Sequence, residues 1–303
     1  MDRHKILVAG NYGEKFIDEL TRWGEVVRAS ADDEAVQLDD ITILVIRSKT
    51  KVNKRLVDRM QSLSCVISAT HGTDHVDLDY LEEKGIRFHN VPVQSYDLAQ
   101  GVIAFILAHS TNLVEGDRSM KRGEWKKKAL KGCRIKGKTL GIIGYGRIGK
   151  EVDRMASALG INVIAYDPYV KENEVVVDLD TLLKTADFIT IHAPLTDETR
   201  GLIGKSEIGK MKDGAYLINT ARGGIIEEKA LLEALNKGKL SGAALDVYEH
   251  QPVFENEVCN KLIRNEKIIA TPHSIGQSTE AVENKGEGVL KVIEDHIRGE
   301  NHH

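Results

Sequence analysis

Residues 139–149 read TLGIIGYGRIG. The stretch joins a short apolar run to the pattern GxGxxG, which is formed by Gly144, Gly146 and Gly149. A continuous apolar run is typical of a parallel strand that is buried on both faces, and Arg147 begins a helical pattern. The order strand, glycine turn, helix therefore predicts a βα unit whose helix N-terminus receives the phosphates of a dinucleotide.

Asp167 completes this fingerprint, because it follows the next predicted strand, 162–166. An acidic residue at this place accepts hydrogen bonds from the adenosine ribose and repels a 2′-phosphate. The predicted cofactor is therefore NAD rather than NADP. The predicted cofactor residues of the fingerprint are Gly144, Gly146, Arg147, Ile148, Gly149 and Asp167. Two alternatives stay open, a glycine-rich turn that binds nothing and an Arg147 that serves a 2′-phosphate.

The whole chain alternates strand-like and helix-like segments. The predicted strands are 5–9, 41–46, 65–69, 86–88, 139–143, 162–166, 188–192, 215–219, 242–246 and 268–271. The predicted helices are 15–23, 54–60, 78–84, 98–115, 147–159, 181–185, 205–211, 227–236 and 278–298, and Gly24 and Gly85 follow two of them as helix-ending glycines. Such alternation predicts the α/β class with two doubly wound parallel-sheet domains, Rossmann-like or flavodoxin-like.

The helix at 278–298 decides the domain limits. If this helix packs back on the first half, the first domain is discontinuous. We then expect a domain of residues 1–95 that is completed by 276–303, and a second domain of residues 96–275.

The composition excludes several classes of function. The 303 residues carry 42 Lys and Arg against 46 Asp and Glu, a net charge of −4, so a basic field for nucleic acid is not expected. No apolar run approaches the roughly 18 residues of a membrane span, and the run 6–9 is too short for a signal peptide. We therefore expect a cytoplasmic protein with neither a nucleic-acid nor a membrane partner.

The three cysteines, Cys65, Cys133 and Cys259, share no metal-ligand spacing. The sequence thus predicts neither a disulfide framework nor a metal centre. His302 and His303 resemble the stub of an expression tag and carry no argument.

Four further motifs follow the fingerprint in a fixed order: IHAPLT at 191–196, NTARGG at 219–224, ALDVY at 244–248 and TPH at 271–273. With these motifs the chain resembles the D-isomer-specific 2-hydroxyacid dehydrogenase family from residue 5 to about residue 298. The resemblance implies two similar α/β domains with the active site in the cleft between them. It assigns the substrate to the first domain and NAD to the second, and it implies a homodimer formed through the cofactor domain.

Hydride transfer from a 2-hydroxy acid also needs a proton acceptor and a cation for the carboxylate. His273 and Arg222 both follow predicted strands, at the edge where α/β proteins bind ligands. His273 is the predicted proton acceptor, and the planar guanidinium of Arg222 suits a carboxylate and the carbonyl oxygen. The resemblance adds a cofactor wall, with Asp246 at the nicotinamide carboxamide. The members of this wall are His192, Pro194, Thr199, Thr220, Ala221, Asp246 and Gly276.

Gln251 departs from the family pattern, which has a Glu five positions after the nicotinamide-binding Asp. A carboxylate would favour the imidazolium of His273, whereas an amide orients the ring without supplying charge. Three interpretations follow: a 2-hydroxyacid dehydrogenase whose histidine has a lower pKa, a formate-dehydrogenase-like hydride transfer, or a repurposed protein. Glu249 would replace the missing carboxylate only if the loop were shifted.

Two segments of the first domain bear on the substrate. Arg47 lies in a segment that resembles the anion-binding loop of phosphoglycerate dehydrogenases, with Lys49 near it. His71, Gly72 and Thr73 belong to a loop that resembles the family's carboxylate-binding glycine loop, where His71 either adds a polar group or packs. We therefore expect a small anionic 2-hydroxy acid or 2-keto acid. Phosphoglycerate-dehydrogenase-like activity leads, with a glyoxylate or hydroxypyruvate reductase and a non-catalytic NAD-binding regulator as alternatives.

Overall fold

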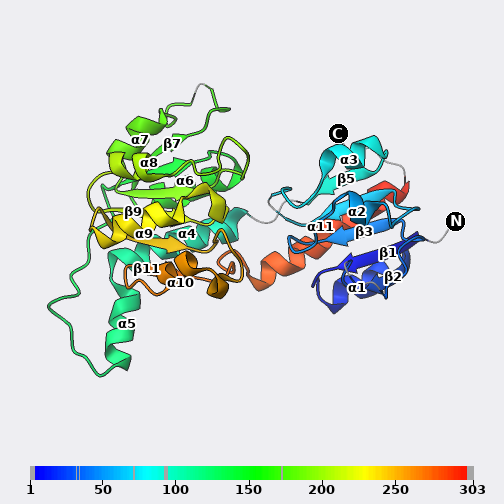
Figure 1. The fold of residues 1–303 in the computed structure, drawn as a ribbon, viewed down its shortest axis with the longest axis horizontal. Coiled ribbons are helices and arrows are strands. Elements are labelled where there is room, and N and C mark those ends of the chain that lie inside the picture. The colour runs from blue at the N-terminus through cyan, green and yellow to red at the C-terminus, as the bar shows by residue number, and fades with distance from the viewer. Residues whose placement is uncertain are drawn as a thin grey trace. The chain divides into compact units, whose positions relative to one another are not determined.

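The computed structural model describes residues 4–31, 33, 35–70, 72–91, 95–171 and 173–298. The chain divides into two compact units, Met1–Gln94 with Ser278–His303, and Ser95–Gln277. Each unit is a parallel sheet flanked by helices, and Figure 1 labels many of the elements of both. The predicted class, α/β with two doubly wound parallel sheets, is confirmed.

The sheet of the first unit has the strand order β2-β1-β3-β4-β5, and every neighbouring pair is parallel. This is the flavodoxin-like order of doubly wound sheets. Its strands are β1 (His4–Ala9), β2 (Gly24–Arg28), β3 (Ile43–Ile46), β4 (Cys65–Ser68) and β5 (Arg87–Asn90). Its helices are α1 (Glu14–Leu20), α2 (Lys54–Val57), α3 (Leu78–Glu83) and α11 (Thr279–Arg298).

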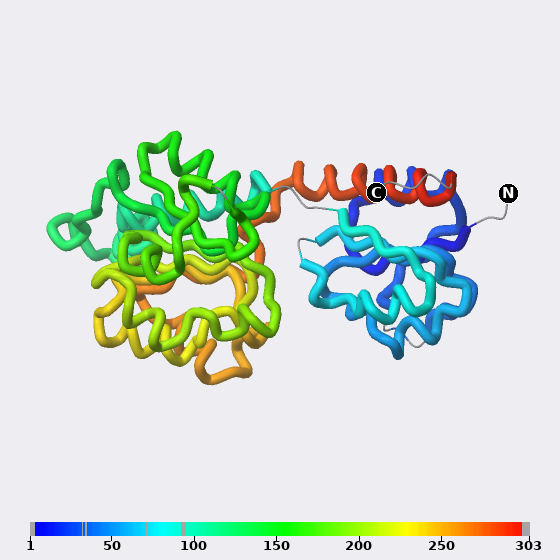
Figure 2. The backbone as a smooth tube through the Cα atoms, turned by 90° about the horizontal axis from the view of Figure 1, so that it is seen from above, coloured from blue at the N-terminus to red at the C-terminus, as the bar shows by residue number. Residues whose placement is uncertain are grey.

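Alternate residues of the first sheet face two apolar layers. One layer lies under α2 and α3. The other contains Cys65 and Ile67 from β4 and is covered by α1 and α11, whose Val289 and Ile293 are fully buried. Figure 2 shows α11 as the red helix that runs beside α1. The C-terminal helix therefore supplies one side of the core of the first unit.

The predicted helix 15–23 is wrong at its C-terminal end, and strand β2 follows it. The helix ends at Leu20, and Gly24 begins a strand instead of following a helix. A Cβ atom on Gly24 would lie 2.0 Å from the carbonyl oxygen of His4, so glycine lets β2 approach β1. The predicted helix-ending role is confirmed for Gly85, which has a φ of +68° after α3.

The sheet of the second unit has the strand order β11-β10-β9-β8-β6-β7, and it is also parallel throughout. Its strands are β6 (Thr139–Ile143), β7 (Asn162–Tyr166), β8 (Phe188–Ile191), β9 (Ala215–Asn219), β10 (Leu240–Leu245) and β11 (Ile268–Ala270). Its helices are α4 (Ser95–Ser110), α5 (Leu113–Lys121), α6 (Arg147–Ala158), α7 (Leu179–Thr185), α8 (Lys205–Lys210), α9 (Glu228–Asn236) and α10 (Glu257–Ile263), with short 3₁₀ turns at Gly223–Ile225 and Val253–Glu255.

The predicted helix 98–115 is two helices, α4 and α5. Asn112 adopts a left-handed conformation with φ 53° and separates them. Just before it, the hydroxyl groups of Ser110 and Thr111 donate to the carbonyl oxygens of Ile106 and Leu107. Such side-chain bonds compete with the helical backbone pattern, and Asn tolerates the left-handed region better than most residues.

The strand order of the second unit reverses between β6 and β8. In open α/β sheets, ligands bind outside the carboxyl ends of the strands at such a switch point. Both the glycine fingerprint, after β6, and His192, after β8, lie there. Among the described residues, no helix is long and apolar enough to cross a membrane.

Candidate active site

Gly144 makes the tight turn after β6. Its φ is +94°, a conformation that side-chain-bearing residues rarely adopt, and a Cβ atom here would lie 2.7 Å from both the nitrogen of Ala193 and the carbonyl carbon of His192. The glycine turn therefore packs directly against the segment that follows β8.

Gly146 and Gly149 are required for different reasons. A Cβ atom on Gly149 would lie 2.3 Å from the carbonyl oxygen of Gly144, so glycine there lets α6 pack on its own turn. A Cβ atom on Gly146 would meet no protein atom within 4 Å. Gly146 is also the N-cap of α6, and no side chain caps that end. The backbone N–H groups at the start of α6 are thus open to an external anion.

The carboxylate of Asp167 holds the glycine turn at the end of β7. It accepts hydrogen bonds from the backbone nitrogen of Tyr145 at 2.8 Å and from that of Tyr169 at 3.0 Å. A carboxylate offers about four acceptor positions. Two backbone donors therefore leave Asp167 with capacity for the hydroxyl groups of a ribose.

Three more of the predicted cofactor residues, His192, Pro194 and Thr199, lie in the segment after β8. The hydroxyl of Thr199 donates to the carbonyl oxygen of Pro194 at 2.6 Å, which closes this loop. His192 stands at its base, with Nε2 3.0 Å from the hydroxyl of Thr190.

The loop after β9 brings Arg222 to the same edge of the sheet. Its carbonyl oxygen accepts from the amide of Asn219 at 2.9 Å, and the half-buried guanidinium donates to the carbonyl of Ala221 at 2.8 Å. A Cβ atom on the next residue, Gly223, would lie 1.9 Å from the carbonyl carbon of Tyr248. The Arg222 loop is therefore in close contact with the loop that carries Gln251.

Gln251 and His273 lie side by side. Oε1 of Gln251 is 3.4 Å from Nδ1 of His273, while Nε2 of Gln251 donates to the carbonyl oxygen of Tyr248 at 3.3 Å. Because the amide nitrogen faces Tyr248, its oxygen faces the ring, and Nδ1 of His273 is the donor. A neutral His273 with this tautomer carries its lone pair on Nε2.

Asp246 anchors the loop that carries His273. Its Oδ1 accepts from the hydroxyl of Thr271 at 2.5 Å, from the nitrogen of Ser274 at 2.8 Å and from that of Ile275 at 3.3 Å. The carboxylate is buried, with 1% of the residue exposed. His273 is exposed and has φ 56°, a conformation that costs free energy outside glycine and that these hydrogen bonds stabilise. Beyond this loop, a Cβ atom on Gly276 would lie 3.2 Å from Leu98 of α4.

The predicted substrate residues lie in the first unit. Arg47 follows β3, and Gly72 and Thr73 follow β4, which is the neighbouring parallel strand. The guanidinium of Arg47 is 3.4 Å from the carbonyl oxygen of Asn11, and the hydroxyl of Thr70 donates to the carbonyl of Gly72 at 2.8 Å. These loops therefore share one edge of the sheet. His71 lies outside the described residues.

Comparison with known proteins identifies the chain's relatives. Residues 103–274 match the model of the D-isomer specific 2-hydroxyacid dehydrogenase, NAD binding domain. The chain is 40% identical over 307 aligned residues to D-3-phosphoglycerate dehydrogenase of Methanocaldococcus jannaschii, covering 98% of this chain and 58% of that protein. It is 43% identical over 252 residues to hydroxypyruvate reductase of Thermotoga maritima, covering 82% of each.

The fold agrees with these sequence matches. The crystal structure of D-lactate dehydrogenase from Aquifex aeolicus, complexed with NAD and lactic acid, superposes with a TM-score of 0.90. The identity is 28%, with 98% of this chain and 96% of that chain covered.

The chain belongs to the D-isomer-specific 2-hydroxyacid dehydrogenase family. The predicted family is thus confirmed. The chain spans 58% of the length of the Methanocaldococcus phosphoglycerate dehydrogenase.

Two observations bear on whether the residues of the second unit fit NAD, the cofactor of this dehydrogenase family. The open space beside Gly146 accommodates a group that approaches the backbone closely, as a pyrophosphate does. The buried hydroxyl of Thr220 has no hydrogen-bonding partner among the described residues, although buried polar groups are normally paired. Both sites lie at carboxyl ends of strands in the second unit, so these residues fit NAD.

Two supporting residues were not predicted from the sequence. Glu228, which is 5% exposed, accepts from the backbone nitrogen of Glu249 at 2.8 Å and from the thiol of Cys259 at 2.9 Å. The hydroxyl of Tyr248 donates to the carbonyl oxygens of Leu245 and Thr271. Both fix the loop before Gln251. A buried acidic residue at a helix start resembles an ordinary exposed one in sequence, so no local signal marks Glu228.

Proposed function

We propose that the protein is an NAD-dependent oxidoreductase that transfers a hydride between nicotinamide and a small anionic D-2-hydroxy acid or 2-keto acid. One observation carries the proposal. The open glycine turn at Gly146, the guanidinium of Arg222 and the His273–Gln251 pair all follow strands of one parallel sheet, so they share its carboxyl edge. A dinucleotide site and a proton acceptor on one edge suit hydride transfer.

NAD, when bound, supplies the hydride acceptor and donor at its nicotinamide ring. The turn from Gly144 to Gly149 binds the phosphates through backbone N–H groups, and Asp167 accepts from the ribose hydroxyls. Thr220 offers the cofactor its hydroxyl, which no described residue pairs with. The remaining cofactor contacts are assigned to His192, Pro194, Thr199, Ala221, Asp246 and Gly276.

His273 accepts the hydroxyl proton at Nε2 when the 2-hydroxy acid is oxidised and returns it in the reverse direction. Gln251 holds the ring through Nδ1 without adding negative charge. Arg222 binds the carboxylate and polarises the carbonyl oxygen with its planar donors. These three residues form the proposed catalytic set.

The proposed substrate is small and anionic. Arg47 provides a cation, and Gly72 and Thr73 provide backbone N–H groups at the edge of the first sheet. His71 is included in this proposal from the sequence alone. Phosphoglycerate-dehydrogenase-like activity is proposed first because the Methanocaldococcus relative covers 98% of the chain. Hydroxypyruvate or glyoxylate reduction is the second candidate, supported by the Thermotoga relative, whose match covers 82% of each protein.

A panel of 2-keto acids tests the proposal. The purified chain is mixed with NADH or NADPH and with phosphohydroxypyruvate, hydroxypyruvate, glyoxylate or pyruvate, and loss of absorbance by the reduced cofactor is followed. We expect turnover with NADH, fastest on phosphohydroxypyruvate. Tight NADH binding without turnover on any acid would instead favour the non-catalytic regulator, and oxidation of formate by NAD would favour the formate-type alternative.

We also propose a cytoplasmic homodimer formed through the second unit. Light scattering of the full chain in solution tests the subunit number, and a monomer at micromolar concentration contradicts the dimer.

A further inference from the structure

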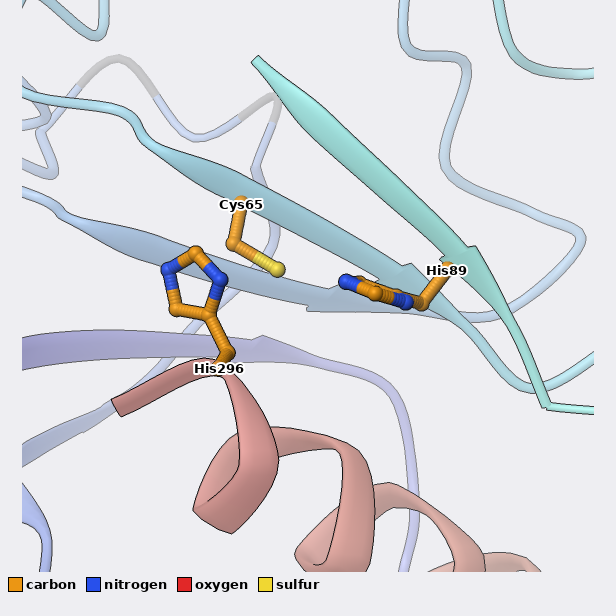
Figure 3. Close-up of side chains that lie close together, drawn as sticks. All are labelled: Cys65, His89 and His296. Carbon is orange, nitrogen blue, oxygen red and sulfur yellow. The ribbon is translucent and has the colours of Figure 1, made fainter. Parts of the chain in front are cut away.

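We propose that Cys65, His89 and His296 form a Zn²⁺ site inside the first unit. The three residues come from β4, β5 and α11, and their ligand atoms all lie within 4.8 Å of one another. Figure 3 shows the sulfur of Cys65 pointing into the space between the two imidazole rings. One sulfur and two imidazole nitrogens are a donor set that zinc prefers.

The register of the sheet explains this convergence. Arg87 of β5 pairs with Cys65 of β4, and His89 pairs with Ile67, so all four side chains are on one face of the sheet. That is the face which α11 covers, since Cys65, Ile67, Val289 and Ile293 belong to one apolar layer. His296 lies about one turn beyond Ile293 and reaches the same layer.

Within the part of the chain that the structure describes, the nitrogen atoms that face the cluster have no hydrogen-bonding partner. Nε2 of His89 and Nδ1 of His296 are buried and make no hydrogen bond among the described residues. A buried polar atom in this condition costs free energy unless it binds something. The rings meet edge to face with centroids 6.4 Å apart, so neither nitrogen bonds to the other ring.

The hydrogen bond to Ser64 selects the tautomer of His296 that can bind a metal through Nδ1. The hydroxyl of Ser64 donates to the carbonyl oxygen of Thr42 at 3.0 Å, and it lies 3.2 Å from Nε2 of His296. A hydroxyl has one proton to donate, so Ser64 accepts from Nε2–H of His296. Nδ1 then carries the lone pair. A second residue that orients the ring in this way is usual around metal-binding histidines.

The charges around the cluster are consistent with this assignment. Burial lowers the pKa of both histidines, and the positive charge of Arg87 lowers them further, which favours the neutral rings. His4 adds to this effect at His296, and Asp295 opposes it at His89. Burial raises the pKa of the Cys65 thiol to about 12, against a smaller opposite effect of Arg87. The thiol proton therefore leaves to solvent only as the zinc–sulfur bond forms, and the thiolate offsets one of the two charges of the ion.

Bond lengths of about 2.3 Å to sulfur and about 2.0 Å to nitrogen place tetrahedral ligand atoms about 3.3–3.7 Å apart. The distances between the three ligand atoms, which are at most 4.8 Å, would therefore shorten by up to roughly 1.5 Å, and a water molecule would complete the coordination. The ion links α11 to two strands of the sheet. This inference does not depend on the proposed dehydrogenase activity.

Cobalt is the probe, because Co²⁺ replaces Zn²⁺ in such sites and absorbs visible light. The metal-free chain, with His302→Ala and His303→Ala in every sample to remove the terminal histidine pair, is titrated with Co²⁺. We expect one equivalent to bind with a thiolate-to-cobalt charge-transfer band and the intense d–d bands of tetrahedral coordination. Zinc should then displace the cobalt and raise the midpoint of thermal unfolding.

Variants assign the ligands. Cys65→Ser should abolish the charge-transfer band, and Cys133→Ser, which alters an exposed thiol, should leave it unchanged. His89→Asn and His296→Asn should each weaken cobalt binding by at least about tenfold, the smallest loss expected when a metal site is disturbed. Circular dichroism checks that each variant folds. If Cys65→Ser does not fold, the two histidine variants decide. A folded, metal-free chain that shows no charge-transfer band, or a band that survives Cys65→Ser, overturns the proposal.

Discussion

At the scale of single residues, the contact between Gln251 and His273 bears on the proton transfer proposed for His273. Its amide oxygen faces Nδ1 of the ring and stabilises the imidazolium less than a carboxylate would. In the proposed mechanism, the imidazolium of His273 is the proton donor when the keto acid is reduced. The activity of the natural enzyme should therefore fall at a lower pH than it would with a Glu–His pair.

Gln251→Glu should move the basic limb of the pH profile of reduction upward by about one unit, because a carboxylate beside an imidazole raises the pKa of that imidazole. The rate of NADH oxidation, measured across pH at saturating keto acid, gives the shift. Glu249→Gln is the control, since it changes an exposed carboxylate in the same loop. An unaltered profile in Gln251→Glu would mean that the two side chains are apart in the working enzyme.

Asp167 should determine the preference for NADH. Asp167→Asn keeps an acceptor for the backbone nitrogens of Tyr145 and Tyr169 but removes the charge that repels a 2′-phosphate. We expect the ratio of the NADPH and NADH dissociation constants to fall by about tenfold, which corresponds to about 1.4 kcal/mol. Fluorescence titration with both cofactors measures the ratio, and a constant ratio contradicts the assignment.

His109 should make the stability of the second unit depend on pH. Burial lowers the pKa of His109 from 6.5 to about 4, and its ring stacks on Tyr216 with centroids 3.7 Å apart. Below pH 6.5 the unfolded chain binds a proton that the folded chain does not, so stability is lost as the pH falls toward 4. The loss is up to about 3 kcal/mol at 1.36 kcal/mol per pKa unit. Urea unfolding of His109→Phe, which keeps the stacking, should show a shallower slope in this window than the natural chain.

At the scale of elements, two glycines in the turn between β6 and α6 have different roles: Gly149 is needed for packing and Gly146 for the proposed binding of the cofactor. Gly146→Ala adds a methyl group in space that is open in the protein, whereas Gly149→Ala forces one against the carbonyl oxygen of Gly144. We expect Gly149→Ala to lower the free energy of unfolding by about 1–3 kcal/mol. Gly146→Ala should leave that free energy within about 0.5 kcal/mol.

The effect of Gly146→Ala is expected on the affinity for NADH instead of on stability. Gly146→Ala should weaken NADH binding by at least about tenfold, or about 1.4 kcal/mol. Calorimetric titration of the folded variant is the measurement. Normal affinity in Gly146→Ala would show that the cofactor does not approach this backbone position.

Elements of the second unit were the most predictable from sequence. The strands 139–143, 162–166 and 215–219 were predicted with the bounds that the structure has, because each is an apolar run in the sequence, although 162–166 is a partly exposed edge strand. Strand β2 was missed, since its pattern is only partly apolar and it lies at the edge of the sheet. Helix α10 was missed as well.

Contacts between distant segments explain what the sequence could not predict at the site. The apolar pattern indicates that a strand exists. It does not indicate which backbone nitrogens will donate to an acidic side chain that follows the strand. The sequence assigns Asp246 to the cofactor. Its three hydrogen bonds to the loop of His273 depend on the pairing of β10 with β11, which the sequence does not reveal. The cluster of Cys65, His89 and His296 has no sequence spacing that predicts it, for the same reason.

At the scale of the whole molecule, the first unit is made from two distant parts of the chain. Ile293 of α11 is fully buried on the first sheet, whereas Lys291 is exposed. Ile293→Ala should therefore cost about 2–5 kcal/mol of stability, and Lys291→Ala should cost little. Hydrogen exchange of the full chain should show faster exchange in β1, β3 and β4 of Ile293→Ala. Equal exchange in the two variants would contradict the role of α11 in this core.

The late position of α11 in the chain also has a consequence for synthesis on the ribosome. The strands of the first sheet emerge early, but Val289 and Ile293, which cover one of its faces, emerge only after the whole second unit. At roughly 5–20 residues per second, this delay is on the order of ten seconds or more. During this time the face with Ile6, Val8 and Ile67 has no helix α11 over it, so nascent chains are expected to need a chaperone until α11 is made.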